Sequence, residues 1–80
     1  MLTLIPTPAG GYEALPVTGT GVNNSAFGDF ALYSNSSGSY NTATGYLALY
    51  SNTTSTYNTA DGVASLYFNT TGDDNTASGY

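Results

Sequence analysis

The stretch NTATGYLALYSNTTSTYNTADG, residues 41–62, contains one phrase twice. NTATG at residues 41–45 returns as NTADG at residues 58–62, which is a spacing of 17 positions. The same spacing holds without insertion from Asn24 to Tyr80. Because a fixed period of this kind is the sequence signature of repeat architectures, it decides the expected fold.

The period divides the chain into similar units of 17 residues. The first unit is degenerate, because Pro8 and Pro16 interrupt it and proline suits an edge better than a central strand. Atypical terminal repeats are usual in such arrays. The expected organisation is a lead-in or cap strand at 1–6, a degenerate repeat at 7–23, full repeats at 24–40, 41–57 and 58–74, and a truncated repeat at 75–80.

A unit of 17 residues is too short for a helix pair or a propeller blade. Gly, Asn, Ser and Thr dominate it, and each disfavours the interior of a helix. We therefore predict an all-β fold, a parallel β-solenoid or β-roll whose coils stack about 4.8 Å apart. In one coil we expect a strand near 42–45, a corner or bulge at the glycine, a second strand near 47–51 and a turn at 52–55.

Some positions of the unit are constant and others vary. The Ala, Gly and Leu positions never change, which indicates a tightly packed interior, whereas the positions just after the glycine vary and are expected at the surface. Asparagine stacked on asparagine can form an amide ladder, and tyrosine can stack on tyrosine. The residues expected to act as structural rungs are Ala26, Gly28, Leu32, Asn41, Ala43, Gly45, Leu49, Asn58, Ala60, Gly62 and Leu66.

The composition excludes several classes of protein. The 80 residues include five acidic residues and no Lys, Arg, His or Cys. Without cations the chain cannot neutralise phosphates, so we expect no nucleic-acid partner and no binding to an anionic membrane, and its apolar runs are too short for membrane insertion. Without Cys and His it has no disulfide and no thiolate or imidazole metal ligand, and we expect no cofactor. A core of this size is marginal, so we expect stacked repeats and association of chains to supply the stability.

The carboxylates do not form a recognisable active site. Cleavage of a glycoside requires two carboxylates that face each other, but Asp29 and Asp61 occupy different positions of the unit, two coils apart. Asp73 and Asp74 follow a glycine and read as turn residues. No loop has the ordered oxygen ligands of a calcium site. We therefore expect no catalytic residue, no metal site and no enzymatic activity.

Three asparagines in the expected turns begin Asn-x-Ser/Thr sequons: Asn35, Asn52 and Asn69. Such a site is an acceptor for N-glycosylation in a secreted protein, so one glycan on each coil is one interpretation. The other is that each side chain caps its own turn. The sequence leaves both open.

Two further columns have alternative interpretations. Tyr33, Tyr50 and Tyr67 recur at the period and could stack on sugars, or pack between coils or between chains. The threonines at 42, 59 and 76 suggest a hydroxyl array that binds ice, although Pro8 and Ser25 interrupt that column.

The phrase NTATGYLALYSNTT, residues 41–54, resembles the head repeats of trimeric autotransporter adhesins. It is also similar to the NTAxGYxALxxNTTG repeats of tail-fibre-like surface proteins that end in an endosialidase-type chaperone domain. The resemblance covers residues 24–80 closely and residues 7–23 loosely. It implies a parallel β-roll, homotrimeric or polymeric chains, and an extracellular location on a cell surface or a virion fibre that binds surfaces.

These observations lead to one functional expectation and one alternative. We expect a structural repeat segment of an extracellular fibre that serves surface attachment, with further copies of itself and surface glycans as partners. The alternative is a self-assembling, glycosylated extracellular filament or matrix subunit, because an exposed end of a coil stack is an unpaired strand edge.

Overall fold

The computed structural model describes residues 9–15 and 20–80 of the chain. The expected lead-in strand at 1–6, together with Pro8 and Pro16, lies outside the described residues. The described part has no helix, and therefore no helix with the length and apolar character needed to cross a membrane. Its strands are β1 (Ala9–Gly10), β2 (Ser25–Phe27), β3 (Thr42–Thr44), β4 (Thr59–Asp61) and β5 (Thr76–Ser78).

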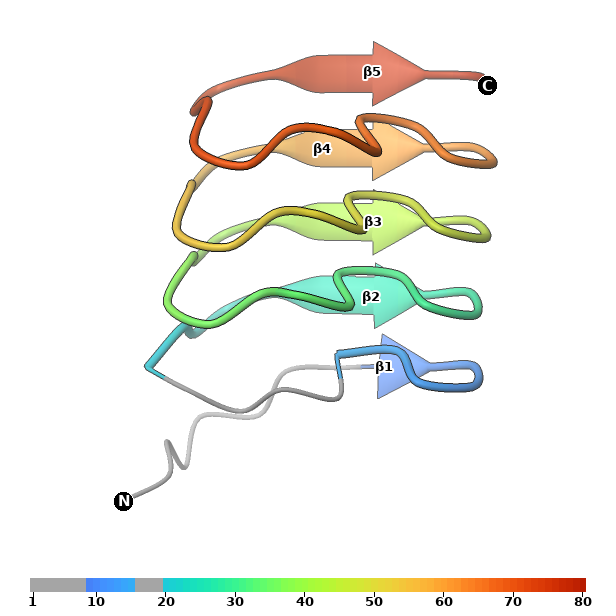
Figure 1. The fold of residues 1–80 in the computed structure, drawn as a ribbon, viewed down its shortest axis with the longest axis horizontal. Helices are drawn as coiled ribbons and strands as arrows, with labels where there is room; N and C mark the ends of the chain where they lie inside the picture. The colour runs from blue at the N-terminus through green and yellow to red at the C-terminus, as the bar shows by residue number, and fades with distance from the viewer. Residues whose placement is uncertain (1–8, 16–19) are drawn as a thin grey trace.

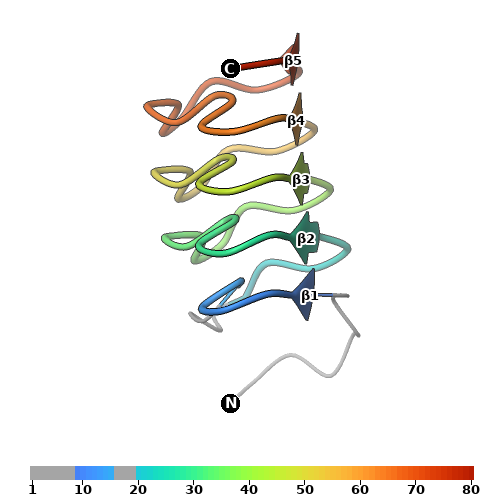
Figure 2. The same cartoon turned by 90° about the vertical axis from the view of Figure 1, so that its right-hand side faces the viewer.

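The five strands form one parallel sheet in chain order, β1-β2-β3-β4-β5. Each residue pairs with the residue 17 positions later, as in Ala26 with Ala43 and Ala43 with Ala60. After β2, β3 and β4 the chain loops out and returns to begin the next strand beside it (Figure 1). Seen from the side, the strands lie along one face and the looped segments along the other (Figure 2). The predicted all-β, parallel arrangement is confirmed.

The prediction of a second strand near 47–51 is wrong. That segment is a series of turns, in which Ala48 N–H donates to the Gly45 carbonyl at 3.2 Å and Asn52 N–H donates to the Leu49 carbonyl at 3.2 Å. Both Ala48 and Leu49 are fully buried. Successive residues of a strand point to opposite faces, so a strand cannot bury both on one side. The chain turns instead, and Leu47 and Leu49 take positive φ values of 64° and 52°.

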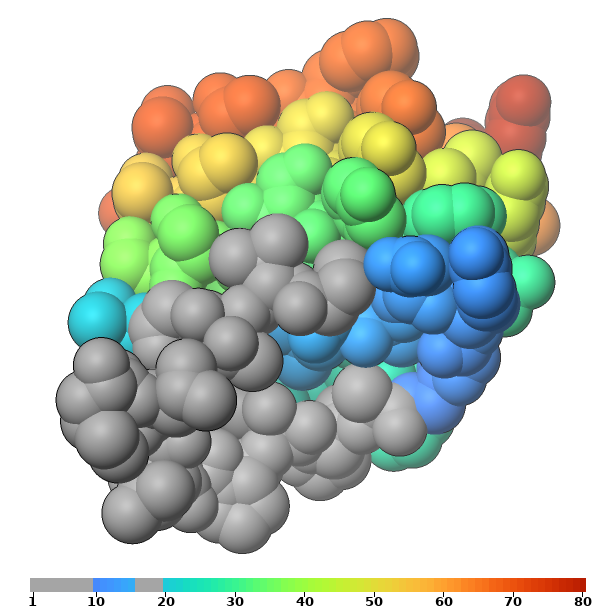
Figure 3. All heavy atoms as spheres, turned by 60° about the horizontal axis from the view of Figure 1, so that its bottom comes forward, coloured from blue at the N-terminus to red at the C-terminus, as the bar shows by residue number. Residues whose placement is uncertain are grey.

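The turn segments are nevertheless bonded from unit to unit. Leu32 N–H donates to the Ala48 carbonyl and Leu49 N–H donates to the Ser65 carbonyl, each at 2.9 Å. Backbone N–H and C=O groups of the turn segments therefore have hydrogen-bond partners in the neighbouring unit. Buried backbone polar groups require such partners. The units lie against one another as successive bands in the space-filling view (Figure 3).

The core is a narrow column of small and aliphatic side chains. Most of its members are at predicted rung positions, whereas Ala31 and Ala48, which precede the leucine of their units, were not among the predicted rungs. The partly buried Ala14, Leu15 and Leu66 pack against it. The fully buried apolar residues are Ala26, Ala31, Leu32, Ala43, Ala48, Leu49 and Ala60.

Close stacking explains the constant glycine. At Gly45 the φ angle is +123°, and a Cβ atom would lie 2.6 Å from the carbonyl oxygen of Gly62 in the next unit. A Cβ atom at Gly28 would likewise lie 2.6 Å from the carbonyl oxygen of Gly45. Only a residue without a side chain fits both the backbone conformation and the approach of the neighbouring unit.

Candidate functional site

A ladder of asparagines runs through the units at positions 24, 41, 58 and 75; the first three are buried and Asn75 is partly exposed. The Oδ1 atom of each accepts a hydrogen bond from the backbone N–H of the next, at 2.9 Å for Asn24 and Asn41 and 3.0 Å for Asn41 and Asn58. The Nδ2 atom crosses the interior of its own unit and donates to a turn carbonyl 14 residues later, at 2.9 Å from Asn41 to Ser55. Each amide therefore closes one unit and joins it to the next.

A second asparagine ladder runs through the sequons. Asn52 Nδ2 donates to Asn35 Oδ1 at 3.1 Å, and Asn69 Nδ2 donates to Asn52 Oδ1 at 3.2 Å. Ser55 Oγ also donates to Asn52 Oδ1. Asn35 and Asn52 are buried, whereas Asn69 is partly exposed. A glycan is attached at Nδ2, so the folded unit has no room for one on Asn35 or Asn52; their amides have the turn-capping role that the sequence left open.

The tyrosines at 33, 50 and 67 form a stacked column. The ring centroids lie 5.0 Å apart for both pairs, with interplanar angles of 5° and 2°. Phe30 packs edge-on against Tyr33 at 5.6 Å, and Phe68 packs edge-on against Tyr67 at 4.7 Å. The rings are half-buried. The packing of these phenylalanines and the partial burial of the rings favour packing over sugar stacking for this column.

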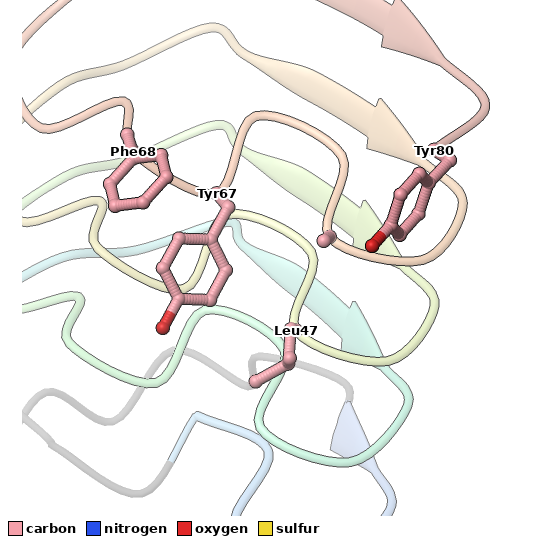
Figure 4. Close-up of a pocket in the computed structure, with 5 residues that line it drawn as sticks. Leu47, Tyr67, Phe68 and Tyr80 are labelled. Carbon is pink, nitrogen blue, oxygen red and sulfur yellow. The ribbon is translucent and has the colours of Figure 1, made fainter.

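An open hollow of about 540 Å³ lies beside this column. Figure 4 shows Leu47, Tyr67, Phe68 and Tyr80 around it. Phe68 is 85% exposed there. Ala64 completes the lining. The side chains that line the hollow expose aromatic surface on the side of the molecule where the turn segments lie.

Sequence reasoning missed a second tyrosine pair. Tyr40 and Tyr57 stack at 5.1 Å with an interplanar angle of 9°, and both are exposed. They lie where the chain enters β3 and β4, and their backbones have positive φ values of 59° and 60°. The period of 17 relates them, and this was the available signal. This tyrosine column is short, because Asn23 and Asp74 occupy the same position in the neighbouring units, and so it does not stand out in the sequence.

Two aspartates accept hydrogen bonds from the backbone of neighbouring units. Asp29 Oδ1 accepts a hydrogen bond from Tyr12 N–H at 2.9 Å, and Asp73 Oδ1 accepts one from Thr56 N–H at 2.7 Å. Both aspartates are exposed. In the described ranges no three potential metal ligands among His, Cys, Asp and Glu come together.

The outer face of the sheet carries the threonine column. Thr42, Thr59 and Thr76 are exposed and in register, and Thr44 lies beside Thr42 on β3. The second column on this face is mixed, because Phe27 and Asp61 flank Thr44 in register. An ice-binding array requires a regular pattern, and the aromatic ring and the charge interrupt it.

Comparison with protein-family models, with curated proteins and with solved structures found no match to this chain.

Proposed function

We propose that the chain is a β-solenoid segment of an extracellular fibre, on a cell surface or a virion, and that it serves attachment to surfaces. The observation that carries this proposal is the pair of largely buried asparagine ladders, which repeat the same bonds from unit to unit. Stability that depends on neighbouring units adds up with their number, as in repeat proteins. Such a design suits a rod.

A non-enzymatic role fits the placement of the polar groups. The buried polar side chains of the described residues are asparagines, which bond to the backbone of their own and neighbouring units, and two serines. The described aspartates are exposed and spread over several units. A catalytic site would require reactive groups that converge in a cleft.

Association of chains is part of the proposal. Tyr46, Val63 and Phe68 are large hydrophobic side chains that are exposed, and Phe68 packs against Tyr67 of the tyrosine column. A surface of this kind can be covered by further copies in a homotrimer, which would place the turn segments inside the fibre.

An end-to-end filament or matrix subunit is the second candidate. β5 lies at the edge of the sheet, and within the described residues no strand pairs with its outer side. A further unit from another chain could bond there through the same backbone groups and the Asn75 position.

Light scattering of the purified chain over a range of concentrations distinguishes these candidates. A discrete trimer supports the fibre, and growth without limit supports the filament. A monomer at every concentration contradicts chain association in both.

A further inference from the structure

We propose that Tyr40 and Tyr57 form a binding site for a neutral, unbranched oligosaccharide. This inference deepens the proposed attachment role and rests on it. The site lies at the corner where the chain enters β3 and β4, at the left edge of the view in Figure 1.

The backbone conformation of these tyrosines is the first observation. A positive φ is costly for a bulky side chain, whereas Asn and Asp tolerate it. Asn23 and Asp74 take the same column with φ values of 59° and 61°. The two central units therefore carry a strained residue where a relaxed one fits, and strain of this kind is concentrated at functional sites.

Burial does not compensate for the strain. Tyr40 is 51% exposed and Tyr57 is 57% exposed. A positive φ also occurs at the fully buried leucines at 32 and 49, which fill the core. It recurs just after the constant glycine, at the exposed Glu13 and at Phe30, Leu47 and Ala64, which are partly buried and so bury more of their surface than Tyr40 and Tyr57. Burial of the leucines at 32 and 49 stabilises the fold enough to offset their strained backbone. The two tyrosines bury less of their surface, so their exposed rings require another explanation.

The geometry of the pair offers ring faces to a ligand. The rings are nearly parallel, with centroids 5.1 Å apart. At a contact spacing of about 3.5 Å between the planes, they must be offset by about 3.7 Å. Part of each face is therefore uncovered. The two rings form a stepped strip along the stack, on which the apolar C–H face of a sugar chain can lie.

Polar groups surround this strip. Asn23 and Asp74 are exposed at its two ends, and the hydroxyls of Thr42 and Thr59 are exposed two residues beyond the rings. The backbone bonds that align the column run from Tyr40 N–H to the Val22 carbonyl and from Asp74 N–H to the Thr56 carbonyl, each at 3.1 Å. An apolar platform with amide, carboxylate and hydroxyl groups at its margins suits a ligand with C–H faces and hydroxyl edges.

The charge of the chain selects among sugars. There are five acidic residues and no Lys or Arg, so the chain cannot pair with a carboxylate or sulfate group. Asp74 lies in the same column as the rings and would repel an anionic sugar. Uronic acids, sialic acids and sulfated sugars are therefore excluded, and a neutral chain remains.

Titration calorimetry with cellohexaose, and with a hyaluronan hexasaccharide as its anionic counterpart, tests this site. The key variant is Tyr40→Asn/Tyr57→Asn, because Asn23 shows that asparagine fits this backbone position. It removes both rings and should fold at least as well as the original chain. Tyr12→Asn is the matched control, since Tyr12 is also an exposed tyrosine but lies outside the Tyr40–Tyr57 column and is not among the residues proposed for chain association.

The proposal predicts that the original chain and Tyr12→Asn bind cellohexaose, and that the double variant binds it about tenfold to a hundredfold more weakly. No binding of cellohexaose, equal binding of the anionic hexasaccharide, or full binding by the double variant overturns it. Light scattering of the same samples keeps the two proposals separate. A discrete oligomer that binds no sugar contradicts the site alone, and a monomer that binds cellohexaose contradicts the oligomeric fibre alone.

Discussion

Replacing Asn41 by alanine tests whether the asparagine ladders hold the units together. Asn41 is fully buried, and its amide bonds to two different units. Its Oδ1 atom accepts from Asn58 N–H at 3.0 Å, and its Nδ2 atom donates to the Ser55 carbonyl at 2.9 Å. The substitution leaves Asn58 N–H without this partner and leaves the Ser55 carbonyl only the long bond from Asn52 Nδ2 at 3.5 Å. The bond from Asn41 N–H to Asn24 Oδ1 can persist.

The expected loss in the free energy of unfolding follows from these two backbone groups, Asn58 N–H and the Ser55 carbonyl. A buried donor or acceptor that loses its partner costs about 1–3 kcal/mol. The free energy of unfolding should therefore fall by about 2–6 kcal/mol. For a chain of this size, each kcal/mol corresponds to about 4–8 °C, so the melting temperature should fall by about 10 °C or more.

Urea unfolding followed by circular dichroism and by tyrosine fluorescence measures this loss. Thr42→Ala is the matched control, because Thr42 is the next residue, its side chain is exposed and its backbone N–H still donates to the Asn58 carbonyl. An exposed substitution of this kind should change stability by about 0.5 kcal/mol or less. If Asn41→Ala lost no more stability than Thr42→Ala, the ladder would not be what holds the units together.

Three further substitution pairs test the packing of the units. Gly45→Ala should lose about 1–3 kcal/mol more than Gly79→Ala in urea unfolding, because both have a positive φ but only the Cβ at Gly45 would meet a neighbouring backbone; equal losses would contradict close stacking as the reason for the glycine. Leu49→Ala should lower the melting temperature through a loss of about 2–5 kcal/mol, whereas Val63→Ala at an exposed position should have little effect; similar melting temperatures would place the core elsewhere. Ser65→Ala should raise the free energy of unfolding by up to about 1 kcal/mol, because within the described part of the chain this buried hydroxyl has no hydrogen-bond partner and alanine fills the same position at 31 and 48. Ser55→Ala should act in the opposite direction, since Ser55 Oγ bonds to Asn52 and Asn58; the same sign for both serines would refute this reasoning.

The period of 17 made the parallel sheet and its register predictable, because identical positions such as Ala43 and Ala60 can lie side by side only in a parallel stack. The second strand could not be predicted correctly. The segment from Leu47 to Ser51 is mainly apolar and includes the strand former Tyr50, but burial of the adjacent Ala48 and Leu49 requires a turn. Tertiary packing decides that conformation, and no local pattern reveals it.

The candidate sites were less predictable than the fold. Both uses of Asn35 and Asn52 were consistent with the sequence, and only their burial favours the turn cap. The tyrosines at 33 and 40 both recur at the period of 17, the first in three units and the second in two. Whether a ring is packed by a neighbour such as Phe30 or is exposed depends on how the unit closes, which the spacing alone does not specify.

The asparagine ladders also have a mechanical consequence. Because each unit contacts only its neighbours, a force applied at the two ends along the stack loads the junctions between units in series. The weakest junction should open first, and the chain should then unravel one unit at a time. Each step releases 17 residues, or about 50–55 Å of extended chain after subtraction of one strand spacing. A rod built in this way absorbs work over a long extension, which suits a tether between two bodies that move apart.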